Sequence, residues 1–188
     1  MKHFSSVFLA FLALALFAST CNALKVGDRG KGWRVLEDKN GNPYCAYKGK
    51  FRIQGEVRDI NSANGGACPT PRPQIKAKGR KVSLRNSGSV WTISTVKGNQ
   101  LIKKGKKGYL TPTTDVQTAE WNTNVVMKVT RKPTKWTIGP EDGSSIEDMD
   151  DCLQGLRLST SGTNLNYDCA NREFRYDDEE SSWSLIAV

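Results

Sequence analysis

The stretch WTISTVKGNQLIKKGKKGYLTP, residues 91–112, decides the fold because its first three residues return later in the chain. Trp-Thr-Ile stands at 91–93 and again at 136–138. Phe-Arg-Ile at 51–53 and Trp-Ser-Leu at 183–185 repeat the same order of an aromatic, an outward and an aliphatic residue, with spacings of 40, 45 and 47 residues. Self-similarity at such a period is typical of a repeat architecture.

The segments between these landmarks predict strands rather than helices. Short alternating runs such as residues 82–84, 125–129, 156–158 and 165–167 are separated by Gly, Pro, Asn and Ser, which is the pattern of an all-β barrel or sandwich. Three units closed by a fourth aromatic strand predict one closed threefold barrel. Trp91 and Trp136 are then expected at equivalent positions of its core.

The N-terminus predicts an exported protein. Residues 1–23 hold a short basic start, an apolar run from Val7 to Ala18 and small residues around Cys21 and Ala23, as in a cleaved signal peptide. The apolar run is shorter than the roughly 20 residues that span a membrane, and no later stretch is as apolar. We therefore expect a secreted, extracellular protein whose single domain comprises residues 24–188.

Four cysteines remain after removal of the signal, Cys45, Cys68, Cys152 and Cys169. In an exported chain this number suggests two disulfides, with three possible pairings, and buried free thiols are the alternative. Because no CxxC occurs and the only histidine, His3, lies in the signal, we expect no metal site and no cofactor.

Charge is distributed unevenly along the chain, whose formal net charge is +9. Residues 24–135 carry 24 Lys and Arg against 7 Asp and Glu, whereas residues 136–188 carry 3 against 12. This asymmetry suggests a partner with an anionic surface, or self-association of opposite ends. Scattered charge that only keeps the protein soluble is the alternative.

The best exposed feature is the basic turn within the opening stretch, which holds Lys103, Lys104, Lys106 and Lys107 around Gly105. Its apolar flanks predict the tip of a hairpin that enters the barrel. The four ammonium groups are candidates for binding sulfate, phosphate or a carboxylate-rich surface, in a manner sensitive to salt. A solvated turn that protects a sheet edge is the alternative.

Catalytic groups are scarce in the chain. Without a histidine after the signal, a Ser-His or Cys-His pair is excluded, and no Gly-x-Ser-x-Gly turn or phosphate-binding glycine loop occurs. The carboxylates crowd into residues 147–151 and 177–180, where solvated loops are the simpler interpretation than a glycosidase pair. We therefore predict that the protein is not an enzyme.

Two β-trefoil families share features with this chain. Residues 35–43, the Phe51 strand, a glycine pair and Cys68-Pro69 followed by Gln74 resemble the opening of Kunitz-type (soybean trypsin inhibitor-like) protease inhibitors. The resemblance implies a β-trefoil, that is, three pseudo-repeats of about four strands forming a closed barrel with a hairpin cap. It also implies inhibition through an exposed loop, for which Arg85 and Asn86 are the candidates.

The last third resembles a ricin-B-type lectin repeat, from Trp136-Thr137-Ile138 through Cys152-Leu153 to the Trp183 strand. This resemblance implies a disulfide within one repeat, between Cys152 and Cys169, which leaves Cys45 with Cys68. A lectin repeat of this type binds its sugar through an acidic residue shortly after the Cys-Leu strand, and in this chain Gln154 occupies that position.

The function predicted from sequence is therefore non-enzymatic binding by what we expect to be a monomer. We favour inhibition of an extracellular protease, because the Kunitz-like opening stands where that family has it and the lectin acids are missing. Binding of a carbohydrate or glycosaminoglycan is the alternative, and nucleic acid is not expected as the partner. A third possibility is an effector or structural protein that keeps only the scaffold.

Overall fold

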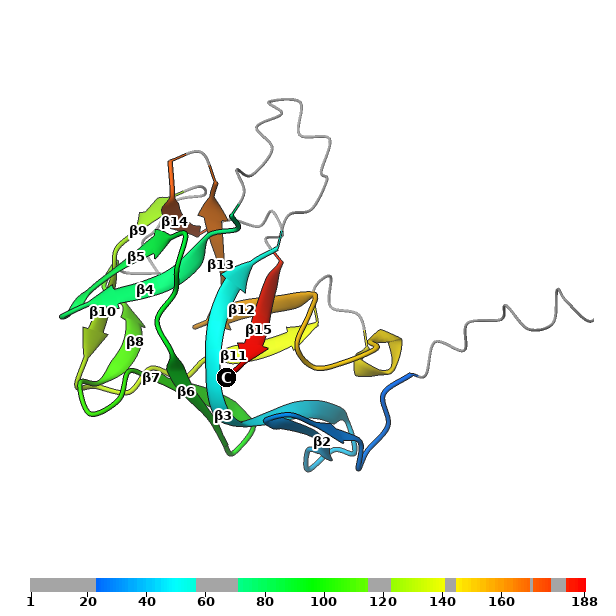
Figure 1. Ribbon diagram of the computed structural model, residues 1–188. Coiled ribbons are helices and arrows are strands. Elements are labelled where there is room, and N and C mark those ends of the chain that lie inside the picture. Colours follow the sequence, from blue (N-terminus) through cyan, green and yellow to red (C-terminus); the bar gives the residue numbers. More distant parts are fainter. Residues whose placement is uncertain (1–22, 57–70, 115–122, 141–144, 170, 177–181) are drawn as a thin grey trace, which may run out of the picture.

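The computed structural model describes residues 23–56, 71–114, 123–140, 145–169, 171–176 and 182–188 (Figure 1). The described chain is all-β, as predicted, and its only helix is the 3-10 helix η3, Ile146–Asp148. No helix among the described residues is long and apolar enough to cross a membrane. All but the last residue of the predicted signal lies outside the described residues.

The strands are short, apart from β3, and follow one another with few residues between them. Their bounds are β1 Arg29–Gly30, β2 Trp33–Glu37, β3 Pro43–Gly55, β4 Gln74–Lys78, β5 Lys81–Arg85, β6 Trp91–Val96, β7 Asn99–Lys103, β8 Tyr109–Pro112, β9 Thr123–Val125, β10 Met127–Thr130, β11 Thr137–Pro140, β12 Leu156–Thr160, β13 Thr163–Asp168, β14 Glu173–Tyr176 and β15 Trp183–Ala187.

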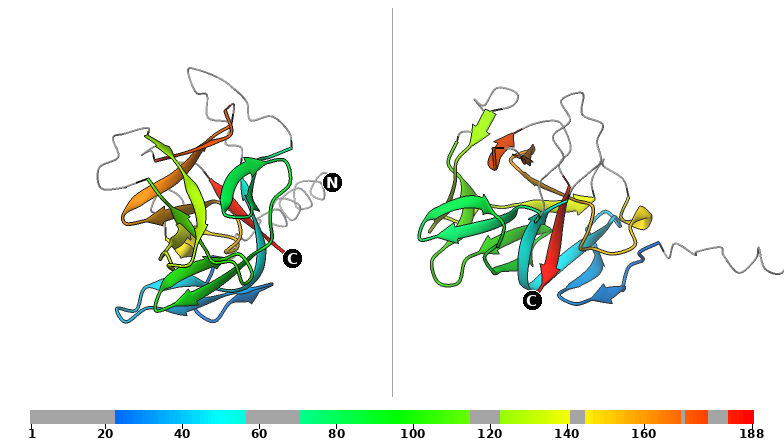
Figure 2. Two further views of the ribbon diagram at one scale, coloured as in Figure 1. Left: turned by 90° about the vertical axis from the view of Figure 1, so that its left-hand side faces the viewer. Right: turned by 45° about the horizontal axis from the view of Figure 1, so that its top comes forward.

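Seven of these strands close into a barrel. The order of pairing is β3, β4, β5, β10, β8, β7 and β6, and β6 pairs with β3 again to complete the ring. The long strand β3 also pairs with β15, the red C-terminal strand beside it in Figures 1 and 2. From β15 the sheet continues through β12, β13, β14 and β9. The prediction of a closed barrel is thereby confirmed.

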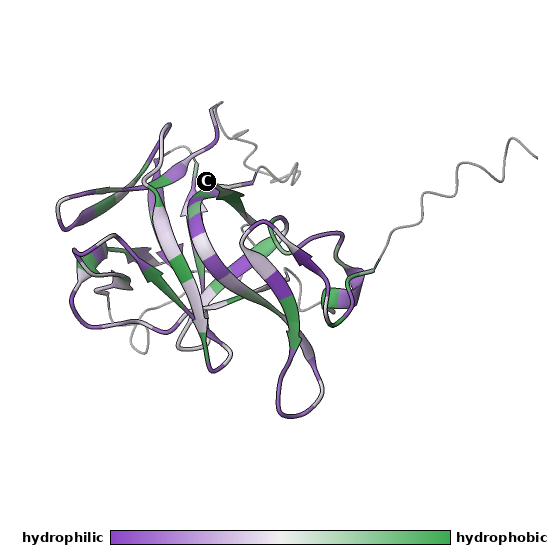
Figure 3. Cartoon of the chain, turned by 60° about the horizontal axis from the view of Figure 1, so that its bottom comes forward, coloured by the Kyte–Doolittle hydropathy of each residue, from purple (hydrophilic) through white to green (hydrophobic). Residues whose placement is uncertain are grey.

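The repeated landmarks form the core. All four aromatic residues of the repeat are inaccessible to solvent, and their aliphatic partners are at most 4% exposed. The intervening residues of the first three repeats, Arg52, Thr92 and Thr137, are exposed because successive side chains of a strand face opposite sides, whereas Ser184 in the fourth is buried. The alternation of polar and apolar colour along the strands is visible in Figure 3. The eight residues are Phe51, Ile53, Trp91, Ile93, Trp136, Ile138, Trp183 and Leu185.

The three tryptophans also share one polar contact. Each buried indole Nε1 donates to a main-chain carbonyl oxygen, at 3.1 Å for Trp91 to Ile75, 3.0 Å for Trp136 to Leu110 and 2.8 Å for Trp183 to Leu165. A buried indole N–H needs such a partner, and the three acceptors lie on β4, β8 and β13. Trp91 and Trp136 thus occupy core positions with the same kind of contact, as the repeat predicted.

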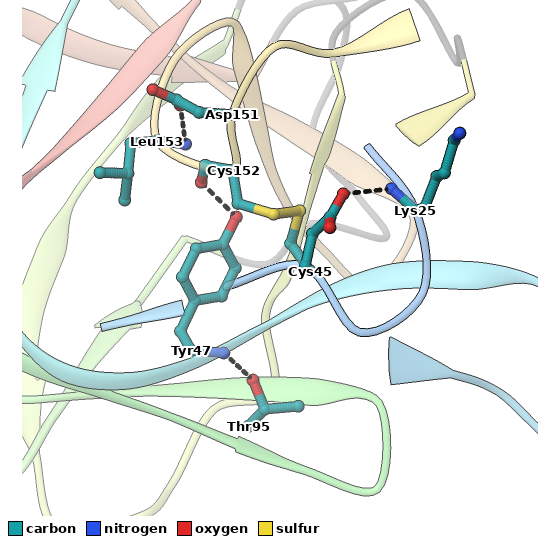
Figure 4. The surroundings of a disulfide bond; sticks show 8 residues. Lys25, Cys45, Tyr47, Thr95, Asp151, Cys152 and Leu153 are labelled. Carbon is teal, nitrogen blue, oxygen red and sulfur yellow. Dashed lines mark hydrogen bonds between the residues drawn. A yellow bond between two sulfur atoms is a disulfide. The ribbon is translucent and has the colours of Figure 1, made fainter. Parts of the chain in front are cut away.

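A disulfide fastens the β2–β3 ribbon to the chain before β12 (Figure 4). It joins Cys45 to Cys152, so the pairing expected from the lectin resemblance, with Cys152 bonded to Cys169 and Cys45 to Cys68, is wrong. Cys169 is also disulfide-bonded, whereas Cys68 lies outside the described residues. Residues that are close in the chain were expected to pair, but the barrel brings Cys45 and Cys152 together across 107 residues.

The buried side chain of Tyr47 forms a second contact between β3 and the chain at Cys152. Its hydroxyl donates to the main-chain oxygen of Cys152 at 2.8 Å, and its amide donates to the Thr95 hydroxyl at 2.7 Å (Figure 4). The side chain is 1% exposed, and this burial raises the pKa of the Tyr47 hydroxyl well above its usual value, with Asp151 adding to the effect. The hydroxyl therefore stays protonated and available as a donor.

Candidate anion-binding face

The basic turn is the tip of the β7–β8 hairpin, as its sequence predicts. Ile102 and Leu110 flank it inside the barrel and are fully buried. The turn is closed by hydrogen bonds from the Lys104 amide to the Gly108 oxygen at 2.8 Å and from the Lys107 amide to the Lys104 oxygen at 3.0 Å. Gly108 is required there, because a Cβ on it would lie 2.1 Å from the carbonyl oxygen of Thr130 and its φ is +137°.

The four lysines of the turn do not act as one cluster. The Lys104 ammonium donates to the Val90 oxygen at 3.0 Å and lies 5.9 Å from the centroid of the Trp91 ring. Burial, followed by repulsion from Lys107, lowers the pKa of Lys104 below its ordinary value. The Lys103 ammonium lies 5.6 Å from the Tyr109 ring centroid. These two side chains therefore have contacts within the hairpin.

Lys106 and Lys107 instead line a groove between the β7–β8 turn, the β4–β5 turn and β10. Its volume is about 680 Å³, and five of the eight described residues that line it are cationic: Arg80, Lys106, Lys107, Lys128 and Arg131. The other three are Gly79, Val129 and Thr130. The turn lysines thus contribute two of five charges to a larger site.

A row of three lysines crosses the neighbouring strands. Lys78 on β4 is opposite Lys81 on β5, and Lys81 is opposite Lys128 on β10. Directly opposed residues point to the same side of a sheet with Cβ atoms about 4.5–5.5 Å apart, and all three are exposed. We call Lys78, Lys81 and Lys128 the lysine row. Like charges directly opposite one another destabilise a sheet.

A second groove, of about 640 Å³, continues the surface along β4 and β5. It is lined by further cations, among them Arg85 and the half-buried Arg172. We define the basic face as the cations of both grooves: Lys76, Lys78, Arg80, Lys81, Arg85, Lys106, Lys107, Lys128, Arg131 and Arg172. The strands β4, β5 and β10, which carry five of these ten cations, lie together in Figure 1.

The charge of the basic face is not neutralised by the described part of the protein. Neither groove has an acidic residue among the described residues that line it. None of the ten cations forms an ion pair with a described carboxylate, since the ion pair between Arg175 and Asp168 includes none of them. Within the described part of the chain, no carboxylate relieves the repulsion in the lysine row, whereas salt or a bound anion would relieve it.

The inhibitory-loop candidates lie at the edge of this face. Arg85 is the last residue of β5, opposite Gln74 of β4, and Asn86 begins the turn that leads to β6. Both are exposed. The turn is held against β4, because the Gly88 amide donates to the Gln74 side chain at 2.8 Å and the Ser89 amide to the Ile75 oxygen at 3.0 Å.

Most of the basic face was not predicted as a site from the sequence. The missed cations come from the β4–β5 hairpin, from β10 and the residue after it, and from the turn before β14, and β10 lies beside β5 only in the barrel. The sequence contains one signal for this face. In KAKGRK, residues 76–81, Lys76 and Lys78 stand at alternate positions before Gly79, and Lys81 stands after it. In a hairpin this spacing places the lysines of both strands on one side.

Comparisons of the chain with protein-family models, with curated proteins and with solved structures gave no match.

Proposed function

We propose that the protein is a secreted β-trefoil that binds acidic polysaccharides through its basic face. The lysine row carries this proposal. Lys78, Lys81 and Lys128 are aligned across three strands at the spacing of a β-sheet, about 4.8 Å per strand. These exposed strand positions would accept almost any polar side chain, yet all three hold lysines that repel one another. Such a local conflict is expected at a binding surface, where function outweighs stability.

The trefoil assignment is supported by the core. Three fully buried tryptophans, each donating to a main-chain oxygen of a strand earlier in the chain, are what three equivalent repeats around one axis would supply. The closed ring of strands accommodates such a core. Export is supported by the disulfide between Cys45 and Cys152, because disulfides persist in oxidising compartments.

A polysaccharide fits the face better than a small anion or a nucleic acid. One sulfate or carboxylate can contact one or two of the aligned ammonium groups, whereas a polyanion laid across the strands contacts all three. Proteins that bind single-stranded nucleic acids stack bases on aromatic side chains, and no aromatic residue is among the described residues lining either groove. Acidic polysaccharides need only charge and hydrogen-bond donors.

The test is binding of dextran sulfate, with neutral dextran as the reference ligand, to the wild type and to Lys81→Gln. Lys81 lies between Lys78 and Lys128, so its loss should weaken binding roughly fivefold, or about 1 kcal/mol. The same variant should unfold at a slightly higher temperature at low salt, because two repulsive pairs are removed. Titration calorimetry and thermal unfolding measure the two effects.

Lys50→Gln is the matched control, because Lys50 is also an exposed strand lysine but lies opposite Thr92 on β6. Lys50→Gln should neither weaken the binding of dextran sulfate as Lys81→Gln does nor raise the unfolding temperature at low salt. Binding should weaken steeply between about 50 and 200 mM salt, as expected for release of counterions. Equal affinity of wild type and Lys81→Gln, or equal binding of neutral dextran, would contradict the proposal.

Inhibition of a protease is the second candidate, favoured by the turn after β5. Besides the two contacts to Gln74 and Ile75, the Ser89 hydroxyl accepts from the Ala77 amide at 3.0 Å. Lys76 also donates to the hydroxyl of Ser87, at 3.2 Å. An inhibitory loop must be rigid, because a loop that is ordered in advance loses less entropy on binding, and this turn is held from beneath while Arg85 and Asn86 remain exposed.

For this candidate we expect that trypsin, subtilisin or papain is slowed stoichiometrically by the oxidised protein while its chain stays intact. Arg85→Ala should abolish the effect on a trypsin-like enzyme, because the side chain that would enter the specificity pocket is lost. Arg52→Ala, a change of an exposed strand arginine on β3, is the control. Residual-activity titration is the measurement, and full protease activity at micromolar protein would exclude this function for the enzymes tested.

A further inference from the structure

A third groove lies on the β2–β3 ribbon, away from the basic face in Figure 1. Its volume is about 650 Å³, and it lies within the range of pockets that take small ligands, about 300–1,000 Å³. Residues of β1, β2, β3 and β6 line it, together with Lys97 in the turn after β6. We call it the ribbon groove.

The floor of the ribbon groove is apolar. Leu36 on β2 is opposite Tyr44 on β3, and Ala46 follows two residues later on the same strand, so the three side chains share one side of the ribbon. Leu36 and Tyr44 are only partly buried. Leu36 and Tyr44 therefore offer a surface of aliphatic and aromatic carbon that the described protein leaves partly uncovered, whereas Ala46 beside them is only 6% exposed.

Trp33 also lines the ribbon groove. It is opposite Gly30 across the β1–β2 turn, and a Cβ on Gly30 would lie 2.5 Å from its indole ring. The ring therefore lies directly against the backbone of Gly30, which fixes its position. Trp33 is partly exposed, unlike the three tryptophans of the core.

The rim is cationic. Arg29 on β1 is directly opposite Arg34 on β2, which places two guanidinium groups on one side of the ribbon. Lys48 and Lys97 also line the groove. No acidic residue is among the described residues that line the groove. None of these four cations forms an ion pair with a described carboxylate.

We propose that the ribbon groove binds a small organic anion in which an aromatic or aliphatic body carries one carboxylate or sulfonate. The body would lie on Leu36, Tyr44 and Ala46, and the anionic group would bind between Arg29 and Arg34. An arginine pair suits this role, because a guanidinium offers two parallel N–H donors to a carboxylate. An inorganic anion would leave the apolar floor exposed, and a neutral ligand would leave the two guanidinium charges opposed.

This site is distinct from the one that carries the proposed function. The basic face has grooves lined mainly by cations and by no aromatic residue among those described, whereas the ribbon groove combines an apolar floor with a charged rim. No described residue lines both sites. Failure of one proposal therefore leaves the other unaffected.

The experiment compares three probes: 2-naphthoate, which has both the aromatic body and the carboxylate, 2-naphthalenemethanol, which has the body without the charge, and acetate, which has the carboxylate without the aromatic body. Binding to the oxidised protein is followed by titration calorimetry and by the fluorescence of Trp33 against a Trp33→Phe reference, at fixed ionic strength. We expect 2-naphthoate to bind at least tenfold more tightly than either other probe. Arg34→Gln should weaken naphthoate at least fivefold and leave the affinity for the neutral alcohol unchanged.

Lys81→Gln serves as the control, because it removes a cation of the basic face and should leave naphthoate binding unchanged. Thermal unfolding of Arg34→Gln checks that the variant is folded, and Arg29→Gln provides an independent second variant. The proposal is overturned if naphthoate and its neutral analogue bind equally, if both arginine variants bind naphthoate like the wild type, or if naphthoate does not bind at millimolar concentration.

Discussion

Replacing both Cys45 and Cys152 by alanine should lower the free energy of unfolding by about 4 kcal/mol. The cross-link spans 107 residues. In the chain-entropy model, closing a loop of about 100 residues lowers the entropy of the unfolded chain and so stabilises the folded state by roughly 4.7 kcal/mol. Small domains are stable by only about 5–15 kcal/mol. The double variant should therefore unfold at a markedly lower urea concentration, measured by tryptophan fluorescence.

The double variant isolates this cross-link, since reduction of the wild type would also break the disulfide of Cys169. Tyr47→Phe is the matched control, because it removes only the hydrogen bond from the same junction to the Cys152 oxygen. A typical hydrogen bond contributes about 1 kcal/mol. A double variant that loses no more than Tyr47→Phe would show that the covalent bond contributes little to stability.

The core could be predicted from the sequence because it depends on local alternation. Trp91, Trp136 and Trp183 each stand two residues before an aliphatic one, and the structure buries the three tryptophans and their aliphatic partners. The pairing of Cys45 with Cys152 could not be predicted in this way. It depends on which loops the closed barrel brings together, and spacing along the chain carries no information about that.

The binding face shows the same division. The lysine hairpin could be predicted because its four lysines stand within five residues around Gly105 and its flanks are apolar, and the structure forms it from β7 and β8. Its partners Arg80 and Lys128 come from the β4–β5 turn and from β10. The separation of Lys104 from the others also could not be predicted, because it depends on the position of the Val90 oxygen beside the buried Trp91.

Replacing Trp136 by alanine should lower the free energy of unfolding by about 3–5 kcal/mol, the usual cost of removing a large buried aromatic side chain. Trp136 is fully buried. Its loss leaves a cavity and removes the donor that satisfies the Leu110 oxygen, and an unsatisfied buried carbonyl adds to the cost. Equilibrium unfolding in urea, followed by circular dichroism because the fluorophore is changed, measures the effect.

The same substitution at Trp91 and at Trp183 tests whether the three repeats are equivalent. Both side chains are fully buried, and both donate to a main-chain oxygen, so a threefold core predicts that the three losses agree within about 1 kcal/mol. Trp33→Ala is the control, because Trp33 is partly exposed and should cost clearly less. If one of the three core tryptophans could be removed as cheaply as Trp33, the repeats would not contribute equally, and the trefoil assignment would lose its strongest support.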